Sequence, residues 1–355
     1  MADTSAAFLG NIATLRDKVA LVTGGSSGLG RAICQAYAAA GAYVVSADLS
    51  PDVPSQSVVQ QKIGKDSDLV TPTVELINKK WPAPDPRTKD SLSVHDKSNT
   101  HAVETVQRAM FVQCDVGQED HVRRAVQACV ERYGRLDVMV NNAGISAETT
   151  TQTYTGASTR THETDVSILD RTLAINVRGV WLGTKHAVQQ FLTQKPHPLW
   201  GQSPWNTSNA SEASQLSDTN PSANNLSGNP SETSEIHRGW IINIASILSS
   251  VGLAGSTTYC ASKGAVLQLT RSTALEYAAD GIHINAIQPG FVDTHILESM
   301  YQNVPGIDQT LKTLHPWGRT GRPEEIARMA VYLAGEGASW VTGSSMVVDG
   351  GYLAQ

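Results

Sequence analysis

The chain has 355 residues, of which 40% are hydrophobic and 17% charged, and its formal net charge is −6. This composition provides for a large buried core and is unlike that of a coiled coil or a charge-driven disordered chain. With a negative net charge and no Lys/Arg-rich run, the chain is not expected to bind nucleic acid or an anionic membrane surface, and no apolar run approaches the ~18 residues that span a bilayer.

The cysteines predict a reducing environment. All four are scattered among apolar or small neighbours and form no Cys-x-x-Cys pair. This usage is typical of reduced, buried thiols in a cytosolic protein. The first residues also lack the basic start and apolar stretch of a secretory signal. We therefore expect a cytoplasmic protein without disulfides.

Short apolar runs alternate with helical patterns along the chain. Seven runs predict strands over 19–25, 42–48, 109–116, 136–142, 240–246, 282–290 and 344–351. Helices are predicted over 118–133, 163–192, 257–278 and 323–334. Because the strands are apolar on both faces, we expect helices to cover the sheet on two sides. The prediction is an α/β fold: a single Rossmann-type, doubly wound domain with a seven-stranded, mostly parallel sheet.

Two segments interrupt this alternation. We expect an N-terminal tail over 1–16 and one domain over 17–355, with insertions at about 51–97 and 195–238. The first insertion is rich in proline where one helix would be sufficient. The second is rich in Ser, Thr, Asn and Pro, and such a composition buries too little apolar area to offset its ordering entropy. It is therefore expected to be disordered.

A glycine-rich turn follows the first predicted strand and precedes a helix. Glycines in this place allow a tight turn and let helix-start N–H groups approach a pyrophosphate, although glycine turns also end strands for structural reasons alone. The residues expected to contact a nucleotide here are Gly24, Ser26, Ser27, Gly28, Leu29 and Gly30.

The second predicted strand ends in Asp48, with Leu49 next. An acid at this point can accept hydrogen bonds from the hydroxyls of an adenosine ribose and repels a 2′-phosphate, so NAD is favoured over NADP. The alternative is that Asp48 only caps the following turn.

Taken in order, several motifs resemble those of the short-chain dehydrogenase/reductase family, in its compact branch of about 250 residues. They are TGGSSGLG at Thr23–Gly30, Asp115-Val116, NNAG at Asn141–Gly144, Asn176 in LAINVRG, Ser246 in NIAS, YCASK at Tyr259–Lys263, PGFVDT at Pro289–Thr294 and the final VVDGG.

The resemblance implies further contacts with a dinucleotide. Asp115 and Val116 would lie near the adenine, and Asn142, Ala143 and Gly144 near the nicotinamide ribose, which Lys263 would also bind. The carboxamide would be held within Pro289–Thr294, by Pro289, Gly290, Val292 and Thr294. Asn176 would hold a water that relays a proton outward.

The catalytic prediction is Asn176, Ser246, Tyr259 and Lys263. A tyrosine with its ordinary pKa of ~10 is a weak base at neutral pH, but residues i and i+4 share a helix face, which brings the Lys263 ammonium beside Tyr259. With a positive nicotinamide nearby, we expect the pKa of Tyr259 to fall by ~2–3 units, which requires roughly 3–4 kcal/mol. Ser246 would stabilise charge on the substrate oxygen. Each residue alone is also common in a purely structural role.

These patterns predict an NAD-dependent oxidoreductase that interconverts a secondary alcohol and a ketone, with Tyr259 as general acid/base. Alternatives are a 3-oxoacyl-type or secondary-metabolite ketoreductase and, from another class, a non-catalytic dinucleotide sensor. No metal is expected, since His283 and His295 lack further ligands at suitable spacing. A small apolar or cyclic substrate is indicated by Ile247, Leu248, Val251, Leu253, Ile296, Leu297, Met300, Tyr301 and Trp317. A homodimer or homotetramer is expected from apolar helices at 163–192 and 257–278.

Overall fold

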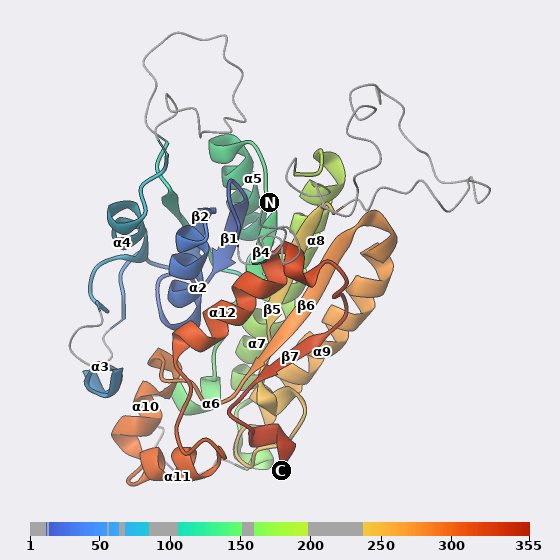
Figure 1. The fold of residues 1–355 in the computed structure, drawn as a ribbon. Helices are drawn as coiled ribbons and strands as arrows, with labels where there is room; N and C mark the ends of the chain where they lie inside the picture. Colours follow the sequence, from blue (N-terminus) through green and yellow to red (C-terminus); the bar gives the residue numbers. More distant parts are fainter. Residues whose placement is uncertain are drawn as a thin grey trace, which may run out of the picture.

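The computed structural model describes residues 12, 14–54, 57–63, 68–84, 106–150, 160–197 and 237–355 (Figure 1). Its centre is one seven-stranded sheet in the order β3-β2-β1-β4-β5-β6-β7, and each pairing between these strands is parallel. The doubly wound prediction is therefore confirmed. The strands are β1 Val19–Thr23, β2 Tyr43–Asp48, β3 Ala109–Gln113, β4 Val138–Asn141, β5 Gly239–Ile244, β6 Ile282–Pro289 and β7 Ser345–Val348.

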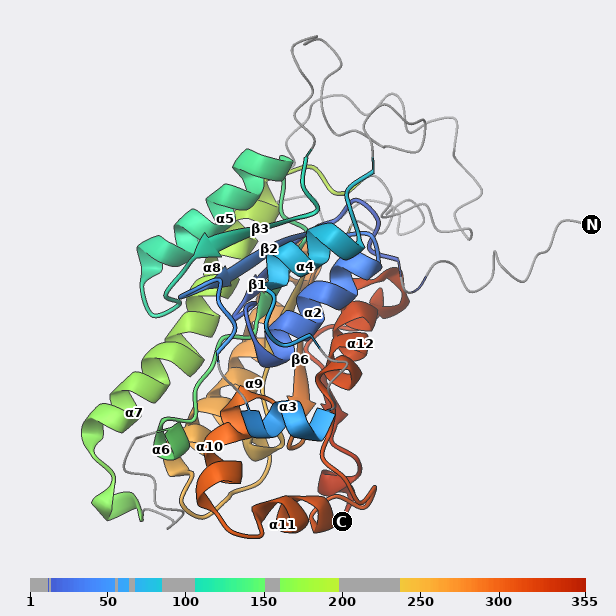
Figure 2. The same ribbon diagram turned by 90° about the vertical axis from the view of Figure 1, so that its left-hand side faces the viewer.

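Helices cover both faces of the sheet (Figure 2). One layer contains α2, α4 and α12, and the other contains α5, α8 and α9; α3, α6, α10 and α11 lie near the carboxyl ends of the strands. The bounds are α2 Gly28–Ala39, α3 Ser57–Ile63, α4 Thr73–Lys80, α5 Glu119–Tyr133, α6 Ala147–Thr150, α7 Val166–Leu173, α8 Gly179–Thr193, α9 Thr257–Tyr277, α10 His295–Asn303, α11 Ile307–Thr313 and α12 Pro323–Ala334.

Strand β1 shows why the strands are apolar on both faces. Ala20 and Val22 belong to the core cluster that includes α2 and α12. Val19 and Leu21 belong to the cluster that includes α5 and α8. All four side chains are almost fully buried. Alternate residues of a strand point to opposite faces, so a central strand that is covered twice needs apolar residues at every position.

Except for the second strand, the predicted strands extend beyond the observed ones at their carboxyl ends. β1 ends at Thr23, and the chain then turns at Gly24 with φ +66°. Similarly, β3 ends at Gln113 and β5 at Ile244. The residues that follow are apolar or small, which is why they resemble strand, but they leave the sheet to form loops. These loops contain most of the predicted site residues.

The insertions are described only in part. Within the first, α4 packs on α2 and β3 and so takes the position of the crossover helix between β2 and β3. In the second, residues 198–236 lie outside the described ranges, so the predicted disorder stays a prediction. Most of the predicted tail, 1–16, also lies outside the described ranges, but Leu15 is fully buried in the core.

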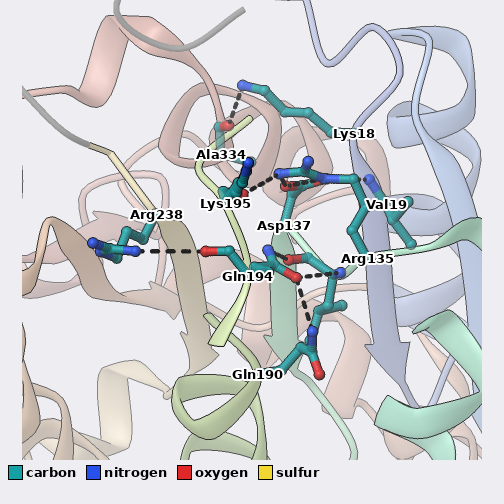
Figure 3. Close-up of polar contacts among 10 residues, drawn as sticks. Lys18, Val19, Arg135, Asp137, Gln190, Gln194, Lys195, Arg238 and Ala334 are labelled. Carbon is teal, nitrogen blue, oxygen red and sulfur yellow. Dashed lines mark hydrogen bonds and ion pairs between the residues drawn. The ribbon is translucent and has the colours of Figure 1, made fainter. Parts of the chain in front are cut away.

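A buried polar network lies at the amino ends of the strands, where the chain enters and leaves the second insertion (Figure 3). Asp137 accepts a hydrogen bond from the backbone N–H of Val19 at 2.9 Å and forms an ion pair with Arg135 at 2.6 Å. The backbone carbonyl of Gln194, at the end of α8, accepts a hydrogen bond from Arg238 at 3.5 Å. The two ends of the insertion are thus bound to each other near the amino ends of the strands.

Within the described residues, no helix is long and apolar enough to cross a membrane. No group of three or more His, Cys, Asp or Glu in that part of the chain is placed to hold a metal ion. His283 instead stacks on Trp240, with ring centroids 4.7 Å apart, and lies 2.7 Å from a ring nitrogen of His237.

Candidate active site

A cavity of about 530 Å³ lies at the carboxyl ends of the strands. Parallel α/β sheets bind ligands at this edge, because the loops that follow the strands meet there. The predicted site residues that line it are Gly24, Ser27, Gly28, Leu29, Asp48, Leu49, Asp115, Val116, Asn142, Ala143, Gly144, Ser246, Tyr259, Lys263, Pro289, Gly290, Val292 and Thr294. Three predicted residues, Ser26, Gly30 and Asn176, are not part of the lining.

The glycine turn between β1 and α2 has the geometry of an anion cradle. Gly24 and Gly28 have φ of +66° and +52°, which L side chains rarely adopt. Ser27 precedes α2 in an extended conformation and makes no side-chain capping bond, so it leaves the first-turn N–H groups of the helix uncapped. A β-carbon on Gly30 would lie 2.1 Å from the Gly24 carbonyl oxygen. Gly30 therefore closes the turn by packing rather than by lining the cavity. The cradle fits a pyrophosphate.

Asp48 is held at the cavity wall by backbone donors. Its Oδ2 accepts a hydrogen bond from the Ser26 N–H at 3.0 Å and its Oδ1 from the Leu49 N–H at 2.8 Å. The Ser26 hydroxyl donates to the Ser50 carbonyl at 2.6 Å. Ser26 thus orients the acid. A carboxylate offers about four lone-pair positions, so Asp48 can still accept hydrogen bonds from ribose hydroxyls.

The loops after β1 and β4 are bound to each other. The Thr23 hydroxyl oxygen accepts hydrogen bonds from the Asn142 and Ala143 N–H groups at 2.9 and 3.0 Å. The Asn142 side chain donates to the Thr23 carbonyl at 2.8 Å. After β3, the Asp115 Oδ1 accepts from the Gly117 N–H at 2.9 Å. These bonds give the cavity a wall fixed by backbone contacts, which is suited to hold a ligand of defined shape.

Ser246, Tyr259 and Lys263 meet on one side of the cavity. An interaction with the Ser246 hydroxyl lowers the pKa of the Tyr259 phenol. The Lys263 Nζ lies 5.7 Å from the centroid of the Tyr259 ring and donates a hydrogen bond to the Ile244 carbonyl at 2.8 Å. The prediction that Tyr259 and Lys263 share a face of one helix is confirmed, since both belong to α9.

The expected fall in the pKa of Tyr259 is not produced by this chain's own residues. Burial raises the pKa of Tyr259 to about 12, and the interaction with the Ser246 hydroxyl offsets only part of that rise. Burial also lowers the pKa of Lys263 to about 8. Removal from water disfavours the charged form of each group, so burial is the largest effect on both pKa values.

Asn176 lies in a π-helical turn, Ala174–Arg178, that joins α7 to α8. Such turns are frequent at functional sites. Its Nδ2 donates to the Ile145 carbonyl at 2.8 Å and to the Ser262 hydroxyl oxygen at 3.0 Å, and its Oδ1 accepts from the Ile145 N–H at 2.8 Å. The Ser262 hydroxyl donates in turn to the Tyr259 carbonyl at 2.7 Å. Asn176 therefore connects the loop after β4 with the first turns of α9.

Glu148 is a residue of the site that the sequence analysis missed. It is 6% exposed, and its Oε1 accepts hydrogen bonds from the Thr258 and Tyr259 N–H groups at 2.9 and 3.1 Å and from the Thr258 hydroxyl. Ser256, the residue before α9, makes no side-chain cap. Glu148 therefore caps the N-terminus of α9, and its charge raises the pKa of Tyr259. The signal in the sequence was only an acid shortly after the NNAG motif.

The wall beyond Tyr259 is apolar. Of the residues expected there, Ile247, Leu248, Leu253, Ile296, Leu297 and Met300 line the cavity. Val251, Tyr301 and Trp317 do not: Val251 and Trp317 are exposed, and the Tyr301 hydroxyl donates to Asp293. Phe291, Val304 and Ile307, which were not singled out in the sequence, also line the cavity. Leu297 and Met300 belong to α10, so this helix forms part of the wall.

Comparison with known proteins places this geometry in a family. A family model described as short chain dehydrogenase matches residues 18–75 and 90–197, and one described as enoyl-(acyl carrier protein) reductase matches 229–353. A short-chain dehydrogenase of Aspergillus ruber, fogB, is 30% identical over 332 residues, covering 94% of this chain and 95% of that protein.

Two further similarities extend over nearly the whole chain. The 2-(R)-hydroxypropyl-CoM dehydrogenase of Xanthobacter autotrophicus is 29% identical over 337 residues, covering 95% of this chain and 99% of that protein. A short-chain type dehydrogenase/reductase from Mycobacterium marinum shares the fold, with a TM-score of 0.65 at 24% identity over 97% of this chain and 99% of that one.

One part of the resemblance was wrong. With 355 residues, the chain exceeds the compact size of about 250 residues that was expected. The motifs, the sheet topology and the similarities to known proteins nevertheless agree. The chain belongs to the short-chain dehydrogenase/reductase family of oxidoreductases, which use nicotinamide dinucleotides.

Proposed function

We propose that the protein is an NAD-dependent oxidoreductase that interconverts a secondary alcohol and a ketone, with Tyr259 as general acid/base. One observation carries the proposal. Ser246, Tyr259 and Lys263 line the same cavity as the Gly24–Gly28 turn. A proton-transfer group and a dinucleotide cradle that share one cavity are what hydride transfer to or from a carbon–oxygen bond requires.

The dinucleotide would be held by the residues that already line the cavity. The uncapped start of α2 would bind the pyrophosphate and Asp48 the adenosine ribose. Asp115 and Val116 would contact the adenine. Asn142–Gly144 and Lys263 would contact the nicotinamide ribose, and the segment Pro289–Thr294 the carboxamide. When bound, the cofactor accepts or donates the hydride. NAD is favoured because the hydrogen bonds to Asp48 come from backbone N–H groups, which leave its negative charge to oppose a 2′-phosphate.

The protein's residues would move the proton. With a pKa of about 12, the Tyr259 phenol is protonated at neutral pH and can donate to the oxygen of a ketone. Alcohol oxidation needs the phenolate, so it requires additional positive charge, which the Lys263 ammonium and an oxidised nicotinamide together would supply. The Ser246 hydroxyl would donate to the oxygen on which charge develops. Both amide donors of Asn176 are used within the protein, so a relay water would bind its acceptors.

The substrate would be a small, apolar or cyclic alcohol or ketone. Ile247, Leu248 and Leu253 supply one part of the wall, and Leu297 and Met300 another. One relative supports a cyclic alcohol by its name: a cis-4-hydroxycyclohexanecarboxylate dehydrogenase of Sinomonas cyclohexanicum is 29% identical over 338 residues, covering 95% of this chain and 97% of that protein.

We also propose a homodimer or homotetramer in the cytoplasm. Large apolar side chains are exposed on α7, α8 and α9, namely Val166, Leu169, Trp181, Leu192 and Leu275. Burial of these exposed apolar side chains between subunits would favour association. The four cysteines are unpaired, which fits a reducing compartment. Light scattering that shows only monomer at micromolar concentration would refute the assembly.

The test is a panel of secondary alcohols and ketones assayed with NAD(H) and NADP(H) by the absorbance of the reduced nicotinamide. We expect turnover of uncharged cyclic substrates with NAD(H). Turnover only of 3-oxoacyl thioesters with NADPH would instead favour the 3-oxoacyl reductase alternative, in line with a Thermotoga maritima 3-oxoacyl-[acyl-carrier-protein] reductase that is 27% identical over 339 residues, covering 96% of this chain and 99% of that protein.

A further inference from the structure

Helix α3, which belongs to the first insertion, packs on α10 (Figure 2). Helix α10 carries Leu297 and Met300 of the apolar wall, and α11 begins at Ile307, which also lines the cavity. A segment of the insertion thus lies against the outer side of the helices that enclose the substrate end of the cavity.

One end of α3 is held by a buried acid of α10. Glu298 is 4% exposed, and its Oε1 and Oε2 accept hydrogen bonds from the Val58 and Val59 N–H groups, both at 3.0 Å. Gln302 donates to the Glu298 Oε1 at 2.8 Å and orients it from the next turn. Because these N–H groups lie in the first turn of α3, they have no partner within that helix. Glu298 therefore serves as the cap of a helix that is remote in sequence.

The other end of α3 is held by Lys62. Its Nζ lies 2.8 Å from the Asp293 Oδ1 and 2.6 Å from the Asp308 Oδ1. It also lies 3.8 Å from the centroid of the Tyr301 ring. Asp293 is fixed further, since its Oδ2 accepts a hydrogen bond from the Thr320 hydroxyl at 2.9 Å. Partly buried pairs that share hydrogen bonds contribute more than isolated surface pairs.

The two acids that bind Lys62, Asp293 and Asp308, both lie next to residues of the cavity wall. Asp293 immediately precedes Thr294, a cavity residue next to the start of α10, and Asp308 immediately follows Ile307 at the start of α11. One ammonium group therefore connects the segment just before α10 with the first turn of α11.

We propose that Lys62 is a positioning residue for the substrate. By holding α10 and α11 against the cavity, it makes the first insertion a determinant of substrate selection; this inference rests on the proposed dehydrogenase function. Because Leu297 and Met300 would contact the alcohol, release of the wall should weaken binding of the alcohol more than binding of the dinucleotide.

The experiment compares Lys62→Met, Lys62→Arg and a matched control, Lys79→Met, in the full chain. Methionine keeps the apolar stem of the lysine and removes its charge, whereas arginine keeps the charge. Lys79 is an exposed lysine on α4 of the same insertion and does not line the cavity. For Lys62→Met we expect KM for the alcohol to rise about tenfold, with partial restoration in Lys62→Arg and a smaller rise in the dissociation constant of NAD⁺, because Asp293 lies in the segment proposed to hold the carboxamide.

Hydrogen exchange supplies a readout that does not depend on turnover. In Lys62→Met, amides of α10 and α11 should exchange about tenfold faster than in Lys79→Met, while those of α9 stay unchanged. If the protein turns over no alcohol but this exchange pattern appears, the proposed function fails and the contact of α3 with α10 and α11 stands. Unchanged KM together with unchanged exchange in Lys62→Met would overturn the inference.

Discussion

Two substitutions of Glu148 separate its role as the cap of α9 from the effect of its charge on Tyr259. Alanine removes the acceptor of the Thr258 and Tyr259 N–H groups, whereas glutamine keeps one acceptor oxygen and removes only the charge. Since α9 carries both Tyr259 and Lys263, the two variants change the placement and the ionisation of the same phenol to different extents.

The expected loss in the free energy of unfolding follows from the hydrogen bonds that each variant removes. An N-cap contributes ~0.5–2 kcal/mol, and a hydrogen bond to a charged group ~1.5–3 kcal/mol. Because Thr258 is buried, water does not replace the lost acceptor readily. We expect Glu148→Ala to lower the free energy of unfolding by about 2–4 kcal/mol, which lowers the thermal midpoint by roughly 5–10 °C in a domain of this size. Glu148→Gln should cost about 1 kcal/mol.

The pH profile distinguishes the charge from the cap. Glu148 raises the pKa of Tyr259, so Glu148→Gln should move the pH dependence of kcat/KM for alcohol oxidation to lower pH. Glu75→Gln, on the exposed face of α4, is the control for a general change in charge. A shift of the profile to higher pH, or an unchanged thermal midpoint in Glu148→Ala, would refute this reasoning.

Three further predictions concern other parts of the fold. Burial lowers the pKa of Lys18 (Figure 3) from 10.5 to about 7. Between these pH values the unfolded chain binds more protons than the folded chain, so the free energy of unfolding rises with pH. Lys18→Met should flatten that rise in urea midpoints measured at several pH values. Gly30→Ala places a β-carbon 2.1 Å from the Gly24 carbonyl oxygen and should weaken NAD⁺ binding more than tenfold by calorimetry, whereas Gly252→Ala, in open space, should not. Asp48→Ala should raise the Kd of NAD⁺ about tenfold or more and lower that of NADP⁺, because it removes both an acceptor and a repelling charge.

The fold and the centre of the site could be predicted because their signals are local. Apolar runs on both faces predict buried parallel strands, and the i, i+4 spacing of Tyr259 and Lys263 predicts the contact that the structure shows. The glycine turn was predictable for the same reason: its residues are consecutive, and Gly24 and Gly28 have the positive φ that only glycine adopts readily.

The parts that could not be predicted depend on contacts between distant segments. Glu148 caps a helix 110 residues further along the chain, and Lys62 reaches an acid 231 residues away. Nothing in the residues beside them distinguishes these side chains from exposed charges. The pKa of Tyr259 was expected to fall because spacing shows its cationic neighbour, but spacing does not show the burial that raises it.

Replacement of Tyr259 by phenylalanine tests most directly whether this phenol carries the proton. Removal of a general acid/base reduces turnover by ~10²–10⁴-fold, and phenylalanine keeps the ring while it removes the hydroxyl. In Tyr259→Phe we expect reduction of the best ketone substrate to fall within that range or further, with the Kd of NADH unchanged. Turnover within a few fold of the unaltered protein would contradict the mechanism, and dinucleotide binding by an unaltered protein that turns over no alcohol or ketone would favour a sensor.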